Sequence, residues 1–439
     1  MRLVILLVCF FIYKSLCSEK NIELEVIYEK TFDEPVVDVI FDTATVTIEE
    51  AKRMGWKEKA FSDKEKDKGK VLISYPRAVL VCKESARGYD GWYMYVHPKP
   101  DLQIRMTGLK FYSKNGEFLK ELEIGKNYNT QYVYLSPQRK YILVSNIPTE
   151  YLPDHRGGAL YDFNGNKIWE IEEHSPIAVS DEGYAIAAYL DWGVPPEPGG
   201  DFYVYNPKGK LIATIENPLK DKTAPLDAYF SKDSEYALLC FRGEGAPPTI
   251  FMLITKEGKI LWKKDFLEYI YTSSGGSVDI LPYKGVAGDV STRRTIFHVF
   301  LIDWQGNLKW FKPVDFWGGV ITSFSQDGEK IYFCSSRGYI GCFKRSDGSI
   351  LWEHKEWMPK SRRVDPSMNI PNFSQIFEHF KFLIARTDSA LFFFDKERGE
   401  LKKKLTYPGK KIFLTLHNGI PFVIEPRDKK ILGLKIEEE

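Results

Sequence analysis

The sequence predicts an all-β protein, an eight-bladed β-propeller built from four-stranded antiparallel blades. A glycine-centred hairpin recurs along most of the chain, a second type of hairpin precedes several of these, and strand-like segments at the two ends of the chain complement each other. The glycines lie about 47 residues apart on average over a chain of 439 residues. A repeat of this period is typical of propellers, in which each repeat forms one blade.

The glycine-centred hairpins supply two strands of each blade. Each combines an alternating apolar stretch, a short polar turn with glycine, and a second apolar stretch, as in LYDFNGNKIWEI. Glycine supplies the positive φ that such turns require, and a polar side chain three residues before it can bond to the backbone of the turn. The seven glycines are Gly116, Gly165, Gly209, Gly258, Gly306, Gly348 and Gly399.

A second hairpin, marked by a serine in its turn, precedes four of these segments and supplies the other two strands. The serines are Ser136, Ser180, Ser231 and Ser325. Two hairpins per period make a four-stranded antiparallel sheet, which cannot bury both faces by itself. Radial stacking of such sheets into a propeller solves this problem.

The ends of the chain predict how the ring closes. After the last glycine hairpin come three strand-like segments near 411–416, 421–425 and 431–436, and the segment IELEVIYEKTF near the N-terminus can supply the missing fourth strand. This pairing protects both ends from fraying and gives eight blades. A seven-bladed ring is the alternative, because the first blade is irregular and the fifth, around 269–294, lacks the serine hairpin.

The first 17 residues have the pattern of a secretory signal peptide. An apolar run between Arg2 and Lys14 is shorter than the roughly 20 residues that span a bilayer. We therefore expect an exported mature chain, 18–439, that forms one propeller domain in the periplasm or outside the cell, with no integral membrane span. A lipid anchor at Cys17 is the alternative. A charged, helix-prone insertion at about 47–70 decorates the first blade.

Composition and motifs argue against several classes of function. The formal net charge of +1 gives no field that would hold a nucleic acid. No nucleophile elbow, phosphate loop or metal-binding helix motif occurs, so we expect no catalytic residues, no metal and no cofactor. A hairpin around the SSRG turn pairs Cys334 with Tyr339 or Ile340, which predicts no bridge to Cys342. Whether Cys82, Cys240, Cys334 or Cys342 forms any other disulfide stays open.

In four hairpins a tryptophan follows the glycine by four positions: Trp169, Trp262, Trp310 and Trp352. This pattern resembles the tryptophan-docking repeat of the pyrroloquinoline-quinone-like (PQQ-like) β-propeller superfamily, and Asp395 four residues before Gly399 fits the same repeat. The resemblance implies that these tryptophans pack between blades. It also implies a channel in which quinoprotein dehydrogenases hold quinone and calcium under a disulfide of adjacent cysteines. This sequence has no adjacent cysteines, so it is more similar to exported relatives that act as scaffolds, such as an outer-membrane assembly propeller.

The long connections of the repeat predict where binding occurs. In a propeller, the first-to-second and third-to-fourth turns lie on one rim, and the remaining connections lie on the other. The latter are long here and rich in proline and aromatic residues, and such loops commonly carry binding residues. The candidates are Tyr151, Trp192, Trp317 and Trp357. We expect a non-enzymatic scaffold that binds a protein or cell-envelope component. The alternatives are a PQQ-dependent dehydrogenase and a structural part of an envelope assembly machinery.

Overall fold

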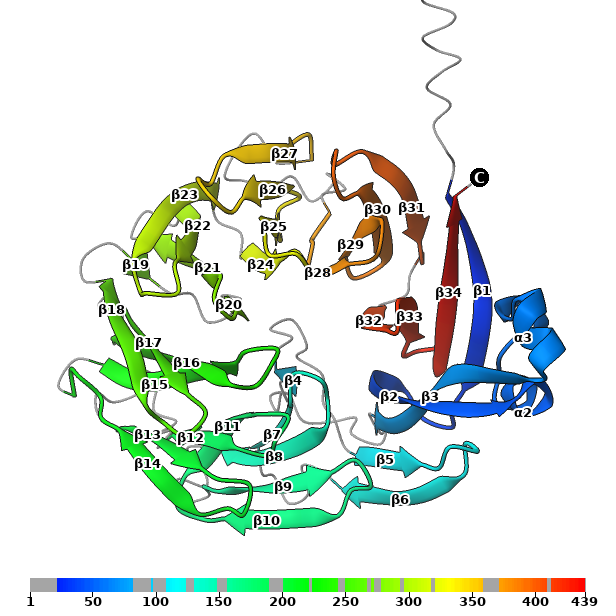
Figure 1. Cartoon of the computed structure of the whole chain (residues 1–439), viewed down its shortest axis with the longest axis horizontal. Helices are drawn as coiled ribbons and strands as arrows, with labels where there is room; N and C mark the ends of the chain where they lie inside the picture. Colours follow the sequence, from blue (N-terminus) through cyan, green and yellow to red (C-terminus); the bar gives the residue numbers. More distant parts are fainter. Residues whose placement is uncertain are drawn as a thin grey trace, which may run out of the picture.

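The computed structural model is an eight-bladed β-propeller whose sheets surround a central axis (Figure 1). Among the residues that it describes, no helix is long and apolar enough to cross a membrane. The described residues are 22–81, 96–97, 108–123, 130–147, 156–188, 200–220, 223–243, 249–266, 270–271, 278–292, 296–316, 320–357, 371–408 and 412–438.

Seven blades follow one another along the chain, each in the strand order first to fourth from the axis outward (Figure 1). Blades 1 to 3 consist of β2 Val36–Thr47, β3 Lys70–Val81, β5 Gly108–Tyr112 and β6 Phe118–Glu123; β7 Thr130–Leu135, β8 Tyr141–Ile147, β9 Gly158–Asp162 and β10 Lys167–Ile171; and β11 Ser175–Val179, β12 Ala185–Ala188, β13 Phe202–Tyr205 and β14 Leu211–Ile215. The short β4 Val96–His97 pairs with β7 in parallel.

Blades 4 to 7 have the same antiparallel order. They consist of β15 Thr223–Phe230, β16 Tyr236–Gly243, β17 Thr249–Thr255 and β18 Ile260–Phe266; β20 Val278–Leu281, β21 Gly285–Thr292, β22 Ile296–Ile302 and β23 Leu308–Phe316; β24 Val320–Phe324, β25 Lys330–Ser335, β26 Ile340–Lys344 and β27 Ile350–His354; and β28 Gln375–Glu378, β29 Phe382–Arg386, β30 Ala390–Asp395 and β31 Leu401–Thr406. In blade 5 the short β19 Ile270–Tyr271 also pairs with β21.

Blade 8 closes the ring with strands from both ends of the chain. β32 Phe413–His417, β33 Ile420–Glu425 and β34 Lys430–Glu438 form its inner part, and β1 Ile22–Thr31 pairs with β34 from Ile22↔Glu438 to Thr31↔Lys430. The predicted closure and the blade number of eight are confirmed. Tyr28 of β1 is fully buried, and its ring lies 5.7 Å from that of Phe422, so side-chain packing supports the main-chain pairing.

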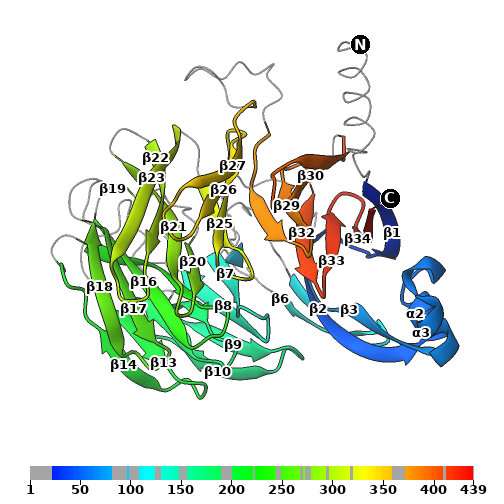
Figure 2. The same cartoon turned by 45° about the horizontal axis from the view of Figure 1, so that its top comes forward.

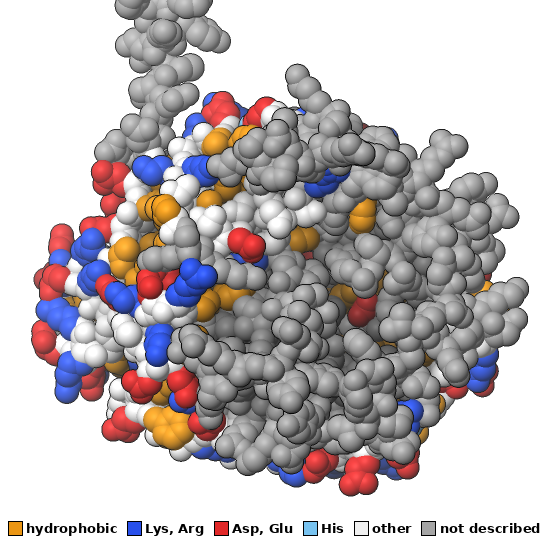
Figure 3. Space-filling model, turned by 180° about the vertical axis from the view of Figure 1, so that it is seen from behind, with side chains coloured by type: hydrophobic (Ala, Val, Ile, Leu, Met, Phe, Trp, Pro, Cys, Tyr) orange, Lys and Arg blue, Asp and Glu red, His pale blue; other side chains and the backbone are white. Residues whose placement is uncertain are grey.

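The charged insertion extends β2 and β3 beyond the ring and carries two short helices at its end (Figure 2). These are α2 Ile48–Arg53 and α3 Asp63–Lys68, with a 3-10 turn at Glu58–Ala60 between them. Thr47 caps α2: its hydroxyl accepts from Glu50 N, and the Glu50 carboxylate accepts from Thr47 N. Figure 3 shows acidic and basic side chains interspersed at this edge of the molecule.

The hydrophobic core lies between the blades. Inner and middle strands are almost continuously apolar and buried, as in Phe382–Arg386, because each of their faces packs on a neighbouring blade. The fourth strands are more exposed, because only one of their faces is covered: every residue of Leu401–Thr406 is exposed or half-buried. This difference follows from radial stacking, in which the outermost strand is an edge.

The two kinds of turn lie on the same rim, which we call the hairpin rim. Lys256 Nζ, in the third-to-fourth turn of blade 4, pairs with Glu235 from the first-to-second turn of that blade (2.9 Å). It also pairs with Glu182 from the first-to-second turn of blade 3 (2.6 Å). The other end of the ring is the loop-rich rim. The predicted signal peptide, 1–17, and Cys82 lie outside the described residues.

Candidate functional site

The four repeat tryptophans lie against the turn glycine of the following blade. The pairs are Trp169 with Gly209, Trp262 with Gly306, Trp310 with Gly348, and Trp352 with Gly399. The indoles are between 7% and 9% exposed. A Cβ atom at Gly209 or Gly306 would lie 2.8 Å from the tryptophan side chain, closer than van der Waals contact allows. Glycine is therefore required both for the positive φ of the turn and for the approach of the indole.

Where a blade has another residue in place of this tryptophan, that residue also lies against the turn glycine of the next blade. Lys120 of blade 1 approaches Gly165, and Ala213 of blade 3 approaches Gly258. At the closure, Lys30 of β1 approaches Gly116 of blade 1. The outer strands of blades 1 to 6 and of blade 8 thus meet the turn of the next blade, which fixes the relative position of these blades at the hairpin rim.

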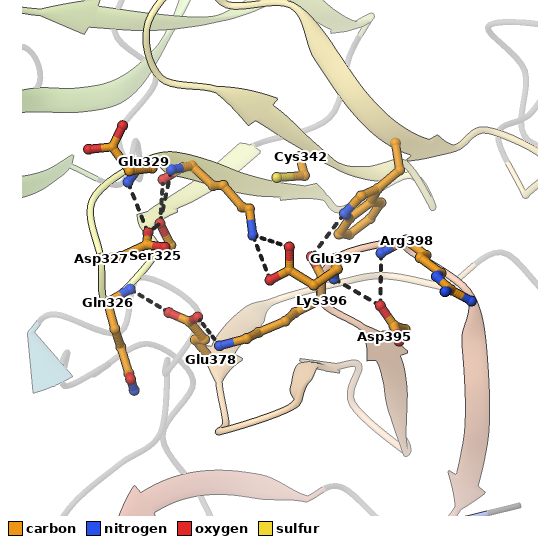
Figure 4. Close-up of polar contacts among 12 residues, drawn as sticks. Ser325, Gln326, Asp327, Glu329, Cys342, Glu378, Asp395, Lys396, Glu397 and Arg398 are labelled. Atoms are coloured by element: carbon orange, nitrogen blue, oxygen red, sulfur yellow. Dashed lines mark hydrogen bonds and ion pairs between the residues drawn. The ribbon is translucent and has the colours of Figure 1, made fainter. Parts of the chain in front are cut away.

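The junction of blades 6 and 7 adds a polar network to this packing (Figure 4). Lys330 Nζ of β25 pairs with both oxygens of Glu397 in the third-to-fourth turn of blade 7, at 2.6 and 2.5 Å. Glu378 accepts from Gln326 N (2.5 Å) and from Lys396 Nζ (2.8 Å). Burial raises the pKa of the nearby Cys342 thiol to about 12. The thiol is therefore neutral and unreactive at neutral pH.

The first strands of the blades surround a central cavity of about 470 Å³. Its walls are largely apolar, with side chains such as Ile177, Phe230 and Ile321. Charged groups lie toward the hairpin rim, where the first strands end. They are Asp38, Arg139, Lys232, Asp279 and Glu378. The side chain of Lys232 is 61% exposed, so the cavity reaches solvent at this rim.

The carboxylates of the cavity bind neighbouring blades to one another. Asp279 of blade 5 accepts from Phe324 N (2.8 Å) and Ser323 Oγ (3.3 Å) of blade 6, and Glu378 joins blades 7 and 6 in the same way. The fully buried Asp38 of blade 1 accepts from Val39 N (2.8 Å) and lies 3.7 Å from Arg139 of blade 2. These acids hold the first strands in place, as expected for buried, paired carboxylates.

The donor set does not fit a calcium-bound quinone. Within the part of the chain that the structure describes, no three His, Cys, Asp or Glu side chains are grouped closely enough to hold a metal ion. The cavity carboxylates come from different blades and are engaged as described above. Cys240, Cys334 and Cys342 are buried, and none of them forms a disulfide within the described part of the chain. Cys334 pairs with Ile340 across the hairpin, as the SSRG turn predicts.

The predicted binding residues are only partly described. Tyr151, Trp192 and Trp317 lie outside the described residues. Trp357 follows β27 and is half-buried. Its ring lies 5.7 Å from Phe392 and 5.5 Å from His354, where it stacks on the imidazole. Its binding role stays a prediction, and its observed contacts are with blades 6 and 7.

Sequence reasoning missed the interblade carboxylates. The available signal is that Asp38 and Asp279 interrupt otherwise apolar first strands, VVDVI and VDIL, and that Glu378 ends the first strand QIFE. A polar residue in a buried strand needs a partner. The partner could not be predicted, because it is a backbone amide or a side chain of another blade.

Comparison with known proteins supports the class, an eight-bladed β-propeller, and no narrower assignment. No family model and no curated protein matches the sequence. Among solved structures, the computationally designed Ika8 protein matches with a TM-score of 0.52 and 9% identity, covering 94% of this chain and 99% of its own.

Two natural propellers are also similar. The dihydro-heme d1 dehydrogenase NirN has a TM-score of 0.50 and 13% identity, covering 75% of this chain and 72% of its own. BamB from Moraxella catarrhalis has a TM-score of 0.47 and 11% identity, covering 75% of this chain and 91% of its own. At these identities the similarity to the Ika8 protein and to NirN shows the fold alone, and function has to be argued from the site.

Proposed function

We propose that the chain is an exported binding scaffold without catalytic activity, a PQQ-like propeller that recognises a protein or cell-envelope component through its loop-rich rim. The observation that carries this proposal is that the carboxylates of the central cavity are engaged in contacts between blades. Each binds a neighbouring blade, whereas a catalytic acid or base must be free to exchange a proton with substrate.

The repeat supports the superfamily and the rigid frame. Four buried tryptophans dock on the following blade, which fixes the positions from which the long loops extend. Rigid elements that carry long loops are a common arrangement for binding sites, because the scaffold positions the loops at little entropic cost.

Cross-linking mass spectrometry in the producing cells tests the proposal. We expect the wild-type chain to capture a defined partner, and the triple variant Tyr151→Ala, Trp192→Ala, Trp317→Ala to lose it without a change in melting temperature. The matched control removes three exposed apolar side chains of outer or extended strands, Leu72→Ala, Phe118→Ala and Ile260→Ala, and keeps the partner. Loss of the partner in the control alone would contradict the proposal.

A further inference from the structure

Blade 5 departs from its neighbours on the hairpin rim. In blades 4, 6 and 7 the second residue of the third-to-fourth turn is a cation that pairs with a carboxylate from the first hairpin of the same blade. The pairs are Lys256–Glu235 (2.9 Å), Arg345–Glu329 (3.6 Å) and Lys396–Glu378 (2.8 Å). In blade 5 this position is Trp304, and the first-to-second turn places Tyr283 beside it. An aromatic pair therefore replaces an ion pair.

Three rings form the aromatic cluster of blade 5, which we define as Tyr236, Tyr283 and Trp304. The Tyr236 and Trp304 centroids are 4.7 Å apart at 86°, those of Tyr283 and Trp304 are 5.6 Å apart at 45°, and those of the two tyrosines are 6.3 Å apart at 82°. Tyr283 is 75% exposed, and Trp304 is half-buried. The cluster presents ring surface to solvent on the hairpin rim.

The backbone at Tyr283 is strained. Lys284 N donates to Leu281 O (3.0 Å) across a turn that has Pro282 second and Tyr283 third, and φ of Tyr283 is +61°. Glycine or asparagine is favoured at such a position, because a Cβ atom is unfavourable there. An exposed ring held in a strained turn contributes little to the core, and strain of this kind is typical of functional positions.

The polar groups of the cluster are limited in number and kind. The Tyr236 and Tyr283 hydroxyls lie 3.3 Å apart, so one donates to the other and the second O–H is left to donate elsewhere. Their hydrogen bond raises the pKa of Tyr236 to about 12, which keeps this phenol protonated at neutral pH. The exposed Asp233 lies near Tyr236 and makes no ion pair with any described residue.

We propose that the aromatic cluster of blade 5 binds an extended, proline-rich segment of a partner protein that carries a lysine or arginine. Proline rings pack on exposed aromatic surfaces, and a polyproline II segment is preformed, so it loses little entropy on binding. The carbonyl groups of such a segment have no donors within the segment, so one of them can accept from the remaining tyrosine O–H. Proline has no N–H, so it needs no acceptor from the site. Asp233 supplies the counter-charge for the basic residue. This site is on the rim opposite the loops and does not depend on the proposed function.

Fluorescence anisotropy tests the site with a labelled peptide of ten prolines followed by two arginines, added to the mature full chain. We expect saturable binding that Trp304→Ala and Tyr283→Gly each weaken at least about tenfold, as for aromatic hot spots. Tyr283→Gly also removes the strain, so its melting temperature stays the same or rises. Phe380→Ala, which removes another exposed ring from a first-to-second turn, keeps wild-type affinity. Asp233→Asn loses the preference for this peptide over decaproline.

Four results would overturn the site. These are no saturable binding of the proline peptide, equal binding of a glycine–serine peptide with the same two arginines, unchanged affinity in folded Trp304→Ala and Tyr283→Gly, and binding of cellohexaose in place of the peptide. The last result would assign the cluster to carbohydrate. The loop-rim triple variant must bind the peptide as wild type does, which separates this site from the proposed function.

Discussion

The four blade junctions with a docked tryptophan differ in whether the indole N–H has a hydrogen-bond acceptor among the described residues. At the 5/6 and 6/7 junctions, Trp310 Nε1 donates to Arg345 O (2.8 Å) and Trp352 Nε1 donates to Lys396 O (3.1 Å). At the 2/3 and 4/5 junctions, Trp169 Nε1 and Trp262 Nε1 are buried without an acceptor among the described residues. The ring packs on a glycine in all four cases.

The length of the receiving turn explains this difference. Gly348 N and Gly399 N bond to the carbonyl four residues earlier, on Lys344 and Asp395. Gly209 N and Gly306 N bond to the carbonyl three residues earlier, on Asn206 and Asp303. In the longer turns, which have one more residue before the glycine, the carbonyl of the second residue, Arg345 or Lys396, accepts from the docked indole. Packing and hydrogen bonding at a blade junction are therefore separable. The length of the receiving turn decides whether the indole N–H has a hydrogen bond.

The largest effect is expected from removing the indole at each type of junction. Trp352→Ala and Trp169→Ala should each lower the free energy of unfolding by about 3–5 kcal/mol, because both leave a cavity. Trp352→Ala should be the more severe, since it also leaves Lys396 O without its donor. Urea denaturation of the full chain measures both. A loss below about 1 kcal/mol in either variant would contradict the docking role.

The glycine side of the junction should show a smaller effect. Gly399→Ala introduces a Cβ atom that overlaps the Trp352 ring at φ +74°, whereas Gly69→Ala has φ +66° and open space around the new atom. We expect a loss of about 2–4 kcal/mol for Gly399→Ala and about 1–2 kcal/mol for Gly69→Ala. In a Trp352→Ala background the two losses should become equal, and a persistent difference would assign the clash to another neighbour.

Replacing tryptophan with phenylalanine tests the indole N–H alone. Trp310→Phe and Trp352→Phe should lower the free energy of unfolding by about 1 kcal/mol more than Trp169→Phe and Trp262→Phe. All four variants lose a similar volume, but only the first two lose a hydrogen bond. Thermal denaturation of the four variants side by side measures the difference. Equal losses at all four positions would mean that turn length has no energetic consequence.

The smallest effect is expected from the ion pair of the 6/7 junction. Glu397 is 60% exposed, so Glu397→Gln should destabilise by about 0.2–1 kcal/mol at low salt and less at 1 M NaCl. Glu400→Gln, which breaks the pair with Lys402 within blade 7 (2.6 Å), is the control for an ion pair that joins no blades. An effect of Glu397→Gln above 2 kcal/mol would make the ion pair, and not the tryptophan, the main contact of the junction.

Much of the frame could be predicted from the sequence. Glycines such as Gly209 recur about every 47 residues, and repeat tryptophans such as Trp169 follow a glycine by four residues, because each blade must present the same outer strand to the next. The closure by β1 could be predicted because the last blade lacks a strand and the first residues of the fold supply one. The indole acceptor could not be predicted, since Lys396 O is a main-chain atom whose position depends on turn length.

The candidate sites were less predictable. The fifth blade is marked in the sequence by its missing serine hairpin, but nothing there shows that Tyr236, Tyr283 and Trp304 meet, because they come from three turns or strand ends of two blades. The carboxylates of the cavity have partners in neighbouring blades for the same reason. Contacts between repeats depend on the three-dimensional arrangement, whereas contacts within a hairpin are encoded locally.

Native mass spectrometry, combined with calcium and quinone analysis, tests the central claim most directly when the protein is purified from the cells or medium that produce it. A scaffold without a cofactor should have the mass of a chain that begins at Ser18, with neither calcium nor quinone, and should retain a protein partner under mild conditions. A stoichiometric quinone with calcium would contradict the account and make the central cavity an active site.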